Sequence, residues 1–260
     1  MIKHMRYLNK VLLLLLLCLF CCTAACQQSV TPLSIYAIRY GASQFPAKQI
    51  FFDEKGTASL PFAWLFYVIK FNGRVMLVDT GFSDRNLAKQ FKVNHEDPIE
   101  LLKSELSIKP EDVTDIVLTH NHFDHIGNVP HFPRAKVYVQ EEALKSPNAS
   151  FLPRDGRLVT FKDEYALEPW LRIRHVGGHT KESSVVWLQS GENTFLFTGD
   201  EAYLLENIEQ SRPLGFVHDK TKNAQFIKDV KSMDKVQILT FHSPEHVPKN
   251  KKSALIYKSQ

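Results

Sequence analysis

Cysteine is absent from this 260-residue sequence beyond its first 26 residues. All four cysteines, Cys18, Cys21, Cys22 and Cys26, lie in that opening segment. The rest of the chain therefore has no internal disulfide, no cysteine nucleophile and no thiolate ligand for a metal ion. Any metal site there has to be built from histidine and carboxylate side chains.

The sequence also lacks a strong excess of charge and a low-complexity tract. Its 32 basic residues include Lys3, Arg6 and Lys10, and the 29 others nearly balance the 28 acidic residues. Nucleic-acid-binding proteins usually carry a pronounced basic surface, so we expect no nucleic-acid partner. No linker rich in proline, glycine or serine divides the chain, which predicts one domain over residues 35–260.

The N-terminal segment has the form of an export signal, because three basic residues precede an apolar run too short to span a bilayer comfortably. Thr23-Ala24-Ala25-Cys26 resembles a bacterial lipobox, which implies cleavage before Cys26 and lipidation of its thiol. We expect residues 1–25 to be a lipoprotein signal peptide and residues 26–34 an anchor and tether in the cell envelope. Gln27 does not signal inner-membrane retention, so the outer membrane and periplasm are expected. An ordinary cleaved signal peptide is the alternative.

Apolar segments rich in β-branched and aromatic residues predict a series of strands. Asn72-Gly73 is a strong hairpin signal, Asp97-Pro98 is typical of a helix start, and a second helix is expected over Lys222–Ser232. After the last expected strand a basic tail follows from Lys249, and its residues Lys249, Lys251 and Lys252 are expected to be a solvated surface or to contact anionic lipid heads. The expected strands are Ile35–Ile38, Ala63–Phe71, Arg74–Val78, Thr114–Leu118, Lys136–Val139, Leu171–Val176, Val185–Leu188, Thr194–Phe197 and Val236–Phe241.

A dense cluster of histidines follows one of these expected strands, in the stretch LTHNHFDHIGN. His120 and His122 are two residues apart, so they point the same way if the segment is extended. Asp124 and His125 are adjacent and point apart, which suits one residue for each of two neighbouring metal ions. The pattern His-x-His-x-Asp-His is too specific for a solvated polar loop.

Three further candidate ligands stand at the ends of other expected strands. His179 follows a Gly-Gly pair, Asp200 follows the sequence TFLFTG, and His242 follows VQILTF. His246 is close enough in sequence to replace or support His242. Neutral imidazoles and carboxylates suit zinc and similar divalent ions.

This set of residues resembles the metallo-β-lactamase superfamily, and Asp79-Thr80-Gly81 also matches a turn common there. The resemblance implies an α/β fold, an αββα sandwich of two mixed β-sheets flanked by helices. It also implies two Zn²⁺ or other divalent ions, with Asp200 and a hydroxide between them. The ligands it implies are His120, His122 and His179 for one ion and Asp124, His125 and His242 for the other.

Within the superfamily the chain is most similar to the N-acyl homoserine lactonases, which carry a tyrosine three residues after the bridging aspartate. The resemblance implies that Tyr203 contacts the lactone carbonyl and that Asp124 protonates the leaving alcohol. Packing of Tyr203 beneath the site is the alternative. The chain departs from the lactonase pattern at Lys181-Glu182, where a Pro-Gly pair is usual. Zinc β-lactamases lack an aspartate equivalent to Asp200, so β-lactamase activity is not expected.

We therefore predict a dinuclear zinc hydrolase that opens a lactone or cleaves a related carboxylic ester of a small molecule. Hydrolysis of a phosphodiester or another ester is the alternative within enzymes, and a non-catalytic envelope binding protein is the alternative outside them. Trp64, in the apolar stretch Leu60–Tyr67, is a candidate for lining an acyl-chain pocket or for core packing. Asp79 is expected either to hydrogen-bond the metal-site loop or only to shape a turn. His175 is expected to be structural.

Overall fold

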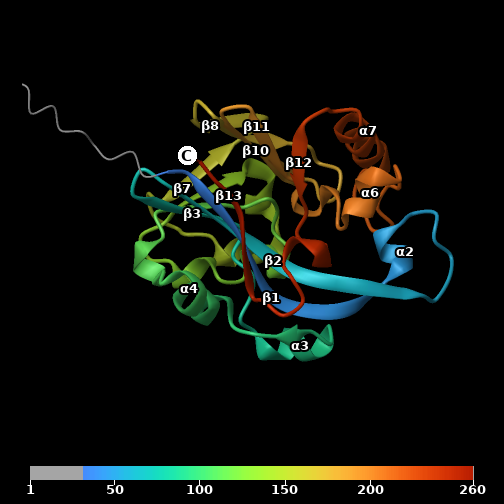
Figure 1. The fold of residues 1–260 in the computed structure, drawn as a ribbon, viewed down its shortest axis with the longest axis horizontal. Coiled ribbons are helices and arrows are strands. Elements are labelled where there is room, and N and C mark those ends of the chain that lie inside the picture. Colours follow the sequence, from blue (N-terminus) through green and yellow to red (C-terminus); the bar gives the residue numbers. More distant parts are fainter. Residues whose placement is uncertain (1–31, 260) are drawn as a thin grey trace, which may run out of the picture. The chain divides into compact units, whose positions relative to one another are not determined.

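Two β-sheets packed face to face form the centre of the fold (Figure 1). The computed structural model describes residues 32–259, so the expected signal peptide and Cys26 lie outside the described residues. Within residues 32–259, no helix is long and apolar enough to cross a membrane.

The first sheet has the strand order β13-β1-β2-β3-β5-β6-β7, with β4 paired to β1. The strand β3 runs antiparallel to β2 and parallel to β5, so the sheet is mixed. Its strands are β1 (Ser34–Pro46), β2 (Ser59–Phe71), β3 (Arg74–Val78), β4 (Asn94–His95), β5 (Asp115–Val117), β6 (Lys136–Gln140), β7 (Leu158–Phe161) and β13 (Ser253–Lys258).

The second sheet has the order β12-β11-β10-β9-β8 and is also mixed, because β11 is antiparallel to β10 and parallel to β12. Its strands are β8 (Glu164–Glu168), β9 (Leu171–His175), β10 (Ser184–Ser190), β11 (Asn193–Phe197) and β12 (Val236–Leu239). The α-helices of the described residues are α2 (Ala47–Ile50), α3 (Arg85–Gln90), α4 (Pro98–Leu106), α5 (Phe123–Ile126), α6 (Leu205–Glu209) and α7 (Lys220–Lys231).

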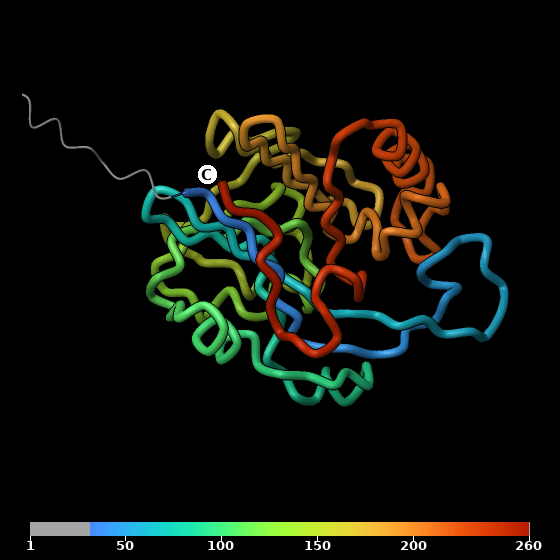
Figure 2. Tube along the Cα trace, viewed as in Figure 1, coloured from blue at the N-terminus to red at the C-terminus, as the bar shows by residue number. Residues whose placement is uncertain are grey.

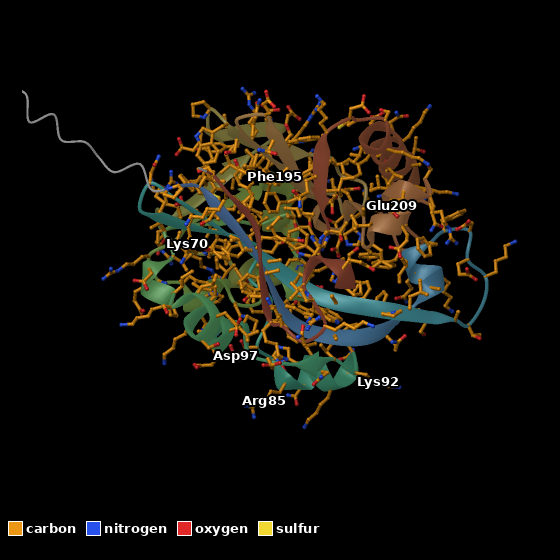
Figure 3. The ribbon with its side chains drawn as sticks, in the orientation of Figure 1. Lys70, Arg85, Lys92, Asp97, Phe195 and Glu209 are labelled. Atoms are coloured by element: carbon orange, nitrogen blue, oxygen red, sulfur yellow. The ribbon has the colours of Figure 1, made fainter. Side chains whose placement is uncertain are left out.

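Helices cover the outer face of each sheet. Leu101 and Leu102 of α4 pack in the hydrophobic core outside the first sheet, and Ile227 and Val230 of α7 pack outside the second. Between the sheets lies a third core that includes Phe195, whereas labelled charged side chains such as Arg85 project from the surface in Figure 3. The molecule is therefore an αββα sandwich, which confirms the predicted fold class.

The sequence of β2 is apolar without interruption because the strand is buried on both faces. Successive side chains of a strand point to opposite faces. Trp64 and Phe66 enter the core beneath the helices, while Leu65 and Tyr67 enter the core between the sheets. Both faces of β2 are buried, so the alternation of apolar and polar residues disappears.

Two local predictions are confirmed by backbone geometry. Asn72 and Gly73 both have positive φ, at 45° and 74°, and turn the chain from β2 into β3. Asp97 caps α4, because its carboxylate accepts a hydrogen bond of 2.8 Å from the backbone N–H of Ile99. These signals are local, so they act in the same way in any fold.

The prediction for the basic tail is wrong beyond Lys252. Residues Ser253–Lys258 form β13, which pairs antiparallel with β1 at the edge of the first sheet. The Arg39 guanidinium donates hydrogen bonds to the backbone carbonyls of Lys249 and Lys251, and Lys252 pairs with Glu96. The lysines therefore lie on an ordered segment. Their charge makes the sequence look like a solvated tail, so the short strand that follows them is not predicted.

The long hairpin of β1 and β2 reaches past the other strands and carries α2 at its tip. Figure 2 shows this blue extension running beside the orange segment that follows α6. The backbone N–H of Phe52 donates to Pro213, and the N–H groups of Gly215 and Phe216 both donate to Gln49. A β-carbon on Gly215 would overlap the Lys48 carbonyl, so the two segments meet without space between them. We call this contact the hairpin joint.

Candidate metal centre

The candidate ligands lie where strands of both sheets end. His120 follows β5, and the short helix α5 that comes next carries Asp124 and His125. Asp200 follows β11, and His242 follows the neighbouring parallel strand β12. Because parallel strands end at the same edge of a sheet, residues far apart in sequence meet there.

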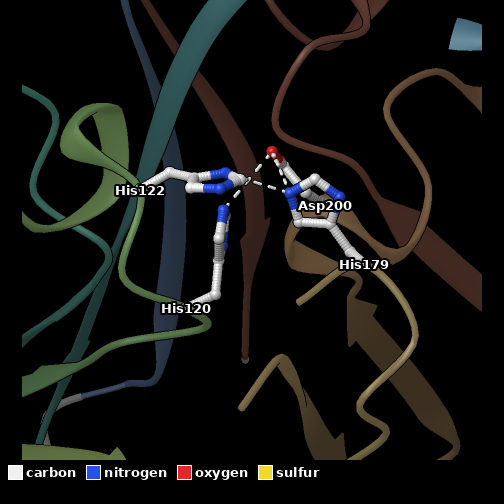
Figure 4. Close-up of side chains that lie close together, drawn as sticks. All are labelled: His120, His122, His179 and Asp200. Carbon is white, nitrogen blue, oxygen red and sulfur yellow. Dashed lines mark hydrogen bonds and ion pairs between the residues drawn. The ribbon is translucent and has the colours of Figure 1, made fainter. Parts of the chain in front are cut away.

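One group of ligand-type side chains consists of His120, His122, His179 and Asp200. Figure 4 shows the three imidazoles converging with the Asp200 carboxylate. Oδ2 of Asp200 lies 3.5 Å from Nε2 of His120 and 3.5 Å from Nε2 of His179. Nε2 of His179 lies 3.1 Å from Nδ1 of His122.

A second group consists of Asp124, His125, Asp200 and His242. Oδ1 of Asp200 lies 3.2 Å from Nε2 of His125 and 3.1 Å from Nε2 of His242. Oδ2 of Asp124 lies 3.4 Å from the same nitrogen of His125. Asp200 is therefore shared, because it presents one carboxylate oxygen to each group.

The chemistry of both groups fits divalent metal ions. Within each group the possible ligand atoms lie within 4.8 Å of one another, and all of these residues except the half-buried His122 are buried. Nε2 of His120 and Nε2 of His125 are buried and have no hydrogen-bond partner among the described residues. Buried polar atoms are rarely left unpaired, so a cation that accepts these lone pairs would resolve the deficit.

Burial and the neighbouring charges set the ionisation of these groups. Burial lowers the pKa of His120 well below its usual value and that of His179 to about 3, which keeps both imidazoles neutral. Burial raises the pKa of Asp200, but the surrounding histidines outweigh it and hold that pKa well below its usual range. Burial alone would lower the pKa of His125, but the carboxylates of Asp200 and Asp124 raise it well above its usual value. Neutral imidazoles and ionised carboxylates are the forms that bind metal ions, so His120, His179 and Asp200 already have the binding form, whereas metal binding at His125 would release its proton.

Two of the histidines are oriented by hydrogen bonds at their other ring nitrogen. Nδ1 of His125 lies 2.6 Å from Oδ2 of Asp79, and Nδ1 of His242 lies 2.8 Å from the Ala63 carbonyl oxygen. Asp79 also accepts hydrogen bonds from the backbone N–H and the hydroxyl of Thr119. Asp79 thus does hydrogen-bond the loop that carries the ligands, in addition to shaping its turn.

The structure distinguishes His242 from His246, its alternative as a ligand, and from His175, which is expected to be structural. His246 lies outside both groups, and its Nε2 accepts a hydrogen bond of 3.1 Å from the backbone N–H of Thr240. His175 is also outside them, with its Nε2 2.8 Å from the Lys181 carbonyl oxygen. Both residues therefore have structural partners.

An aromatic pocket of about 270 Å³ opens onto Asp124, Asp200 and His242. Tyr203 and Trp64 both line it. Tyr203 is 5% exposed, and its ring centroid lies 5.5 Å from those of both His179 and His242. The other aromatic residues of the lining are Phe45, Phe62, Phe91, Phe123 and Phe216.

One buried acidic residue at the site, Glu201, is not predicted from the sequence. Glu201 follows Asp200 directly and is fully buried. Its carboxylate accepts hydrogen bonds from the backbone N–H groups of Gly178 and His179. An acidic residue beside an aspartate is unremarkable in sequence, so only the tertiary structure reveals this contact.

The sequence of residues 65–239 matches the model of the metallo-beta-lactamase superfamily. This match covers most of the chain, so the protein belongs to the metallo-beta-lactamase superfamily. Among curated proteins, the chain is 28% identical over 136 residues to an N-acyl homoserine lactonase of a Bacillus species, which is 47% of this chain and 52% of the relative. It is 29% identical over 112 residues to a probable hydroxyacylglutathione hydrolase of Schizosaccharomyces pombe, 42% of this chain and 41% of that one. The chain thus spans about half the length of the curated lactonases that it matches.

Solved structures show the same fold. A quorum-quenching N-acyl homoserine lactone lactonase superposes with a TM-score of 0.72 at 21% identity, covering 85% of this chain and 96% of that one. An N-acyl homoserine lactone hydrolase with bound product superposes with a TM-score of 0.70 at 21% identity, covering 83% and 95%. The protein is therefore a member of a hydrolase superfamily, related to lactonases, whose histidine and aspartate groups fit divalent metal binding.

Proposed function

We propose that this protein is a dinuclear metal-dependent hydrolase that opens lactones or cleaves related carboxylic esters. The observation that carries the proposal is the position of Asp200, which lines the aromatic pocket and presents one carboxylate oxygen to each of the two histidine groups. The lactonase-like sequence and fold support it. A shared fold does not define a reaction, so the proposal rests on the residues of the site.

The two groups would each hold one divalent ion, and zinc fits their imidazole and carboxylate donors. His120, His122 and His179 would hold one ion, and Asp124, His125 and His242 the other, with Asp200 between them. When bound, such ions lower the pKa of a water and polarise a carbonyl oxygen.

Two residues of the pocket have suitable positions and protonation states for acyl transfer. Burial, followed by the charge of Asp200, raises the pKa of Tyr203 well above its usual value, so its hydroxyl stays protonated and can donate to a substrate carbonyl oxygen. Burial raises the pKa of Asp124, but His125 outweighs it and the net pKa is lowered. Asp124 is then ionised at neutral pH, where it can accept a proton and pass it to the leaving alcohol.

The pocket favours a substrate with an apolar acyl group. Phe62 stacks on the His242 ring with centroids 4.0 Å apart, and Phe45 stacks on Phe62 at 4.4 Å. An alkyl chain that enters this lining loses its contact with water at a gain of about 0.8 kcal/mol for each buried CH₂. The ester carbonyl would then lie beside Asp124 and Asp200, which line the same pocket.

We further propose that the protein is exported and held at a membrane by lipidation of Cys26. The lipobox-like Thr23–Cys26 supports this location. Mass spectrometry of the protein purified from membranes tests it, because lipidated Cys26 is expected at the new N-terminus. Recovery of a soluble form cleaved elsewhere would favour the ordinary signal peptide instead.

Metal content and hydrolysis of one purified sample test the enzyme proposal. About two divalent ions per chain are expected, with acid release from acyl homoserine lactones that a chelator abolishes and zinc restores. Turnover of a phosphodiester alone would keep the metal site and overturn the lactonase assignment. A folded protein that binds no metal and turns over none of the substrates would favour an envelope binding protein.

A further inference from the structure

We infer that Glu201 is a positioning residue, which fixes the loop of residues 177–183 so that His179 faces Asp200. This inference rests on the metal centre of the proposed function and goes beyond its ligands. Glu201 is fully buried, and each partner of its carboxylate is an uncharged donor. A buried carboxylate is costly unless it is fully hydrogen-bonded, so this arrangement needs a structural reason.

Oε1 of Glu201 gathers three donors from the loop that carries His179. It accepts hydrogen bonds of 2.9 Å from the backbone N–H of Gly178, 3.0 Å from that of His179 and 2.5 Å from the Ser183 hydroxyl. These donors come from both ends of the loop. One oxygen therefore closes the loop and fixes the backbone of a candidate ligand directly.

Oε2 of Glu201 is held from the other side by α7. It accepts a hydrogen bond of 3.0 Å from the side-chain amide of Asn223, which also donates to the Glu201 backbone carbonyl. The side-chain amide of Asn223 cannot rotate by half a turn without losing hydrogen bonds, because its carbonyl oxygen accepts one from the backbone N–H of Leu214. The side chain of Glu201 is thus fixed to a helix before it fixes the loop.

The carbonyl oxygens of Gly178 and His179 accept hydrogen bonds from the backbone N–H groups of His218 and Asp219, and Glu201 holds the N–H groups of the same two residues. These contacts fix the backbone, whereas the His179 ring lacks the side-chain hydrogen bond that orients the other histidines. Hydrogen bonds at Nδ1 orient His125 and His242. Among the described residues, Nδ1 of His179 has no hydrogen bond of ordinary geometry, although the Phe216 backbone lies close to the ring. Two glycines also precede His179, and glycine restrains the backbone least.

Gly178 gives independent evidence of how closely the two parts fit. A β-carbon at this position would overlap Oε2 of Glu201 and lie 3.0 Å from the Cα atom of Asn223. The loop therefore approaches Glu201 more closely than a residue with a side chain permits. The same loop carries Lys181-Glu182, where the sequence departs from the lactonase pattern.

Replacement Glu201→Gln tests the inference, because the amide nitrogen of glutamine would face the amide nitrogen of Asn223. The first measurement is amide hydrogen exchange of the metal-free protein, in which Gly178 and His179 are expected to exchange at least about tenfold faster. The second is zinc titration with a competing chromophoric chelator. One of the two binding steps is expected to weaken about 10- to 100-fold, as when a residue that orients a metal ligand is lost.

Asp115→Asn is the matched control, because Asp115 is a buried carboxylate at the other end of β5, bound to Arg74 and Tyr138. It is expected to lower the free energy of unfolding without changing exchange at Gly178 or zinc affinity. Should Glu201→Gln fail to fold, Ser183→Ala removes one of the donors to Glu201. This variant is expected to show smaller changes of the same kind in amide exchange and in zinc affinity.

Unchanged amide exchange and zinc affinity within about twofold of wild type in the Glu201→Gln protein would overturn the inference. Weakening of both zinc steps equally, with a loss of stability like that of Asp115→Asn, would show a general structural role and would also overturn it. These readouts do not depend on the reaction. A wild-type protein that binds zinc but opens no lactone would refute the proposed function and leave this test intact.

Discussion

The carboxylate of Asp79 lies 2.6 Å from Nδ1 of His125, and both residues are buried. The same carboxylate accepts from the backbone and the hydroxyl of Thr119, the residue before His120. Asp79 adopts a positive φ of 61°, a conformation that aspartate and asparagine tolerate better than most residues. One turn residue thus fixes the end of β5 and the ring of a candidate ligand together.

Replacement Asp79→Asn is expected to lower divalent-metal affinity about 10- to 100-fold, because the negative acceptor for the His125 Nδ1–H is lost. Asparagine tolerates the same backbone conformation, so the main change is in the hydrogen bond. Competition with a chromophoric chelator measures the affinity. Asp155→Asn, at an exposed carboxylate, is the control and should bind as wild type does. An unchanged affinity for Asp79→Asn would mean that the residue serves only its turn.

Replacement Tyr203→Phe is expected to reduce kcat for lactone opening about 10²-fold with little change in KM, because one donor to the developing oxyanion is lost. The ring and its contacts with His179 and His242 remain, so the free energy of unfolding should change by less than about 1 kcal/mol. Steady-state kinetics with a lactone substrate measures kcat and KM. Tyr138→Phe, remote from the pocket, should keep wild-type kcat. A Tyr203→Phe enzyme with full kcat would assign the residue to packing.

Replacement Trp64→Ala is expected to reduce the preference for long over short acyl chains, because Trp64 lines the aromatic pocket. The expected loss is about fourfold in relative kcat/KM for each methylene that loses its contact. A series of acyl homoserine lactones of increasing chain length measures it, at a temperature where the variant is folded. Trp187→Ala, on β10 away from this pocket, serves as the control. An unchanged chain-length preference would contradict the acyl-chain role.

The stability of the metal-free protein is expected to depend on pH through His246. Burial lowers the pKa of His246 to about 4, whereas an unfolded histidine titrates near 6.5. The unfolded state therefore binds more protons between these values, and the free energy of unfolding falls as the pH is lowered through that range.

The His246→Gln protein should lose about 2 kcal/mol less than wild type between pH 7.5 and pH 5, because glutamine does not titrate. Urea unfolding in the presence of a chelator at the two pH values measures the difference. Glutamine can still accept from the Thr240 backbone, so packing is largely kept. Equal losses in the two proteins would show that His246 is not neutral and buried in the folded state.

Much of this architecture could be predicted because its signals are local. Asn72-Gly73 turns the chain by its own backbone preference, and the residues His120 to His125 are grouped by sequence alone. His179, Asp200 and His242 were found because a polar residue at the end of an apolar strand stands out. Glu201 and β13 were not predictable in this way. Glu201 has a role only because the loop of residues 177–183 folds onto it, and β13 needs the edge of β1.

The hairpin joint limits the ways in which the aromatic pocket can vary. Backbone hydrogen bonds tie Phe52 to Pro213 and Gln49 to Gly215, and the glycine leaves no space for an added side chain. An insertion in either segment would separate both, so a changed substrate range has to come from replacing side chains such as Phe45 or Phe216. The backbone around the pocket is then expected to stay constant among variants of this protein, while single substitutions in the pocket lining can change which substrates it selects.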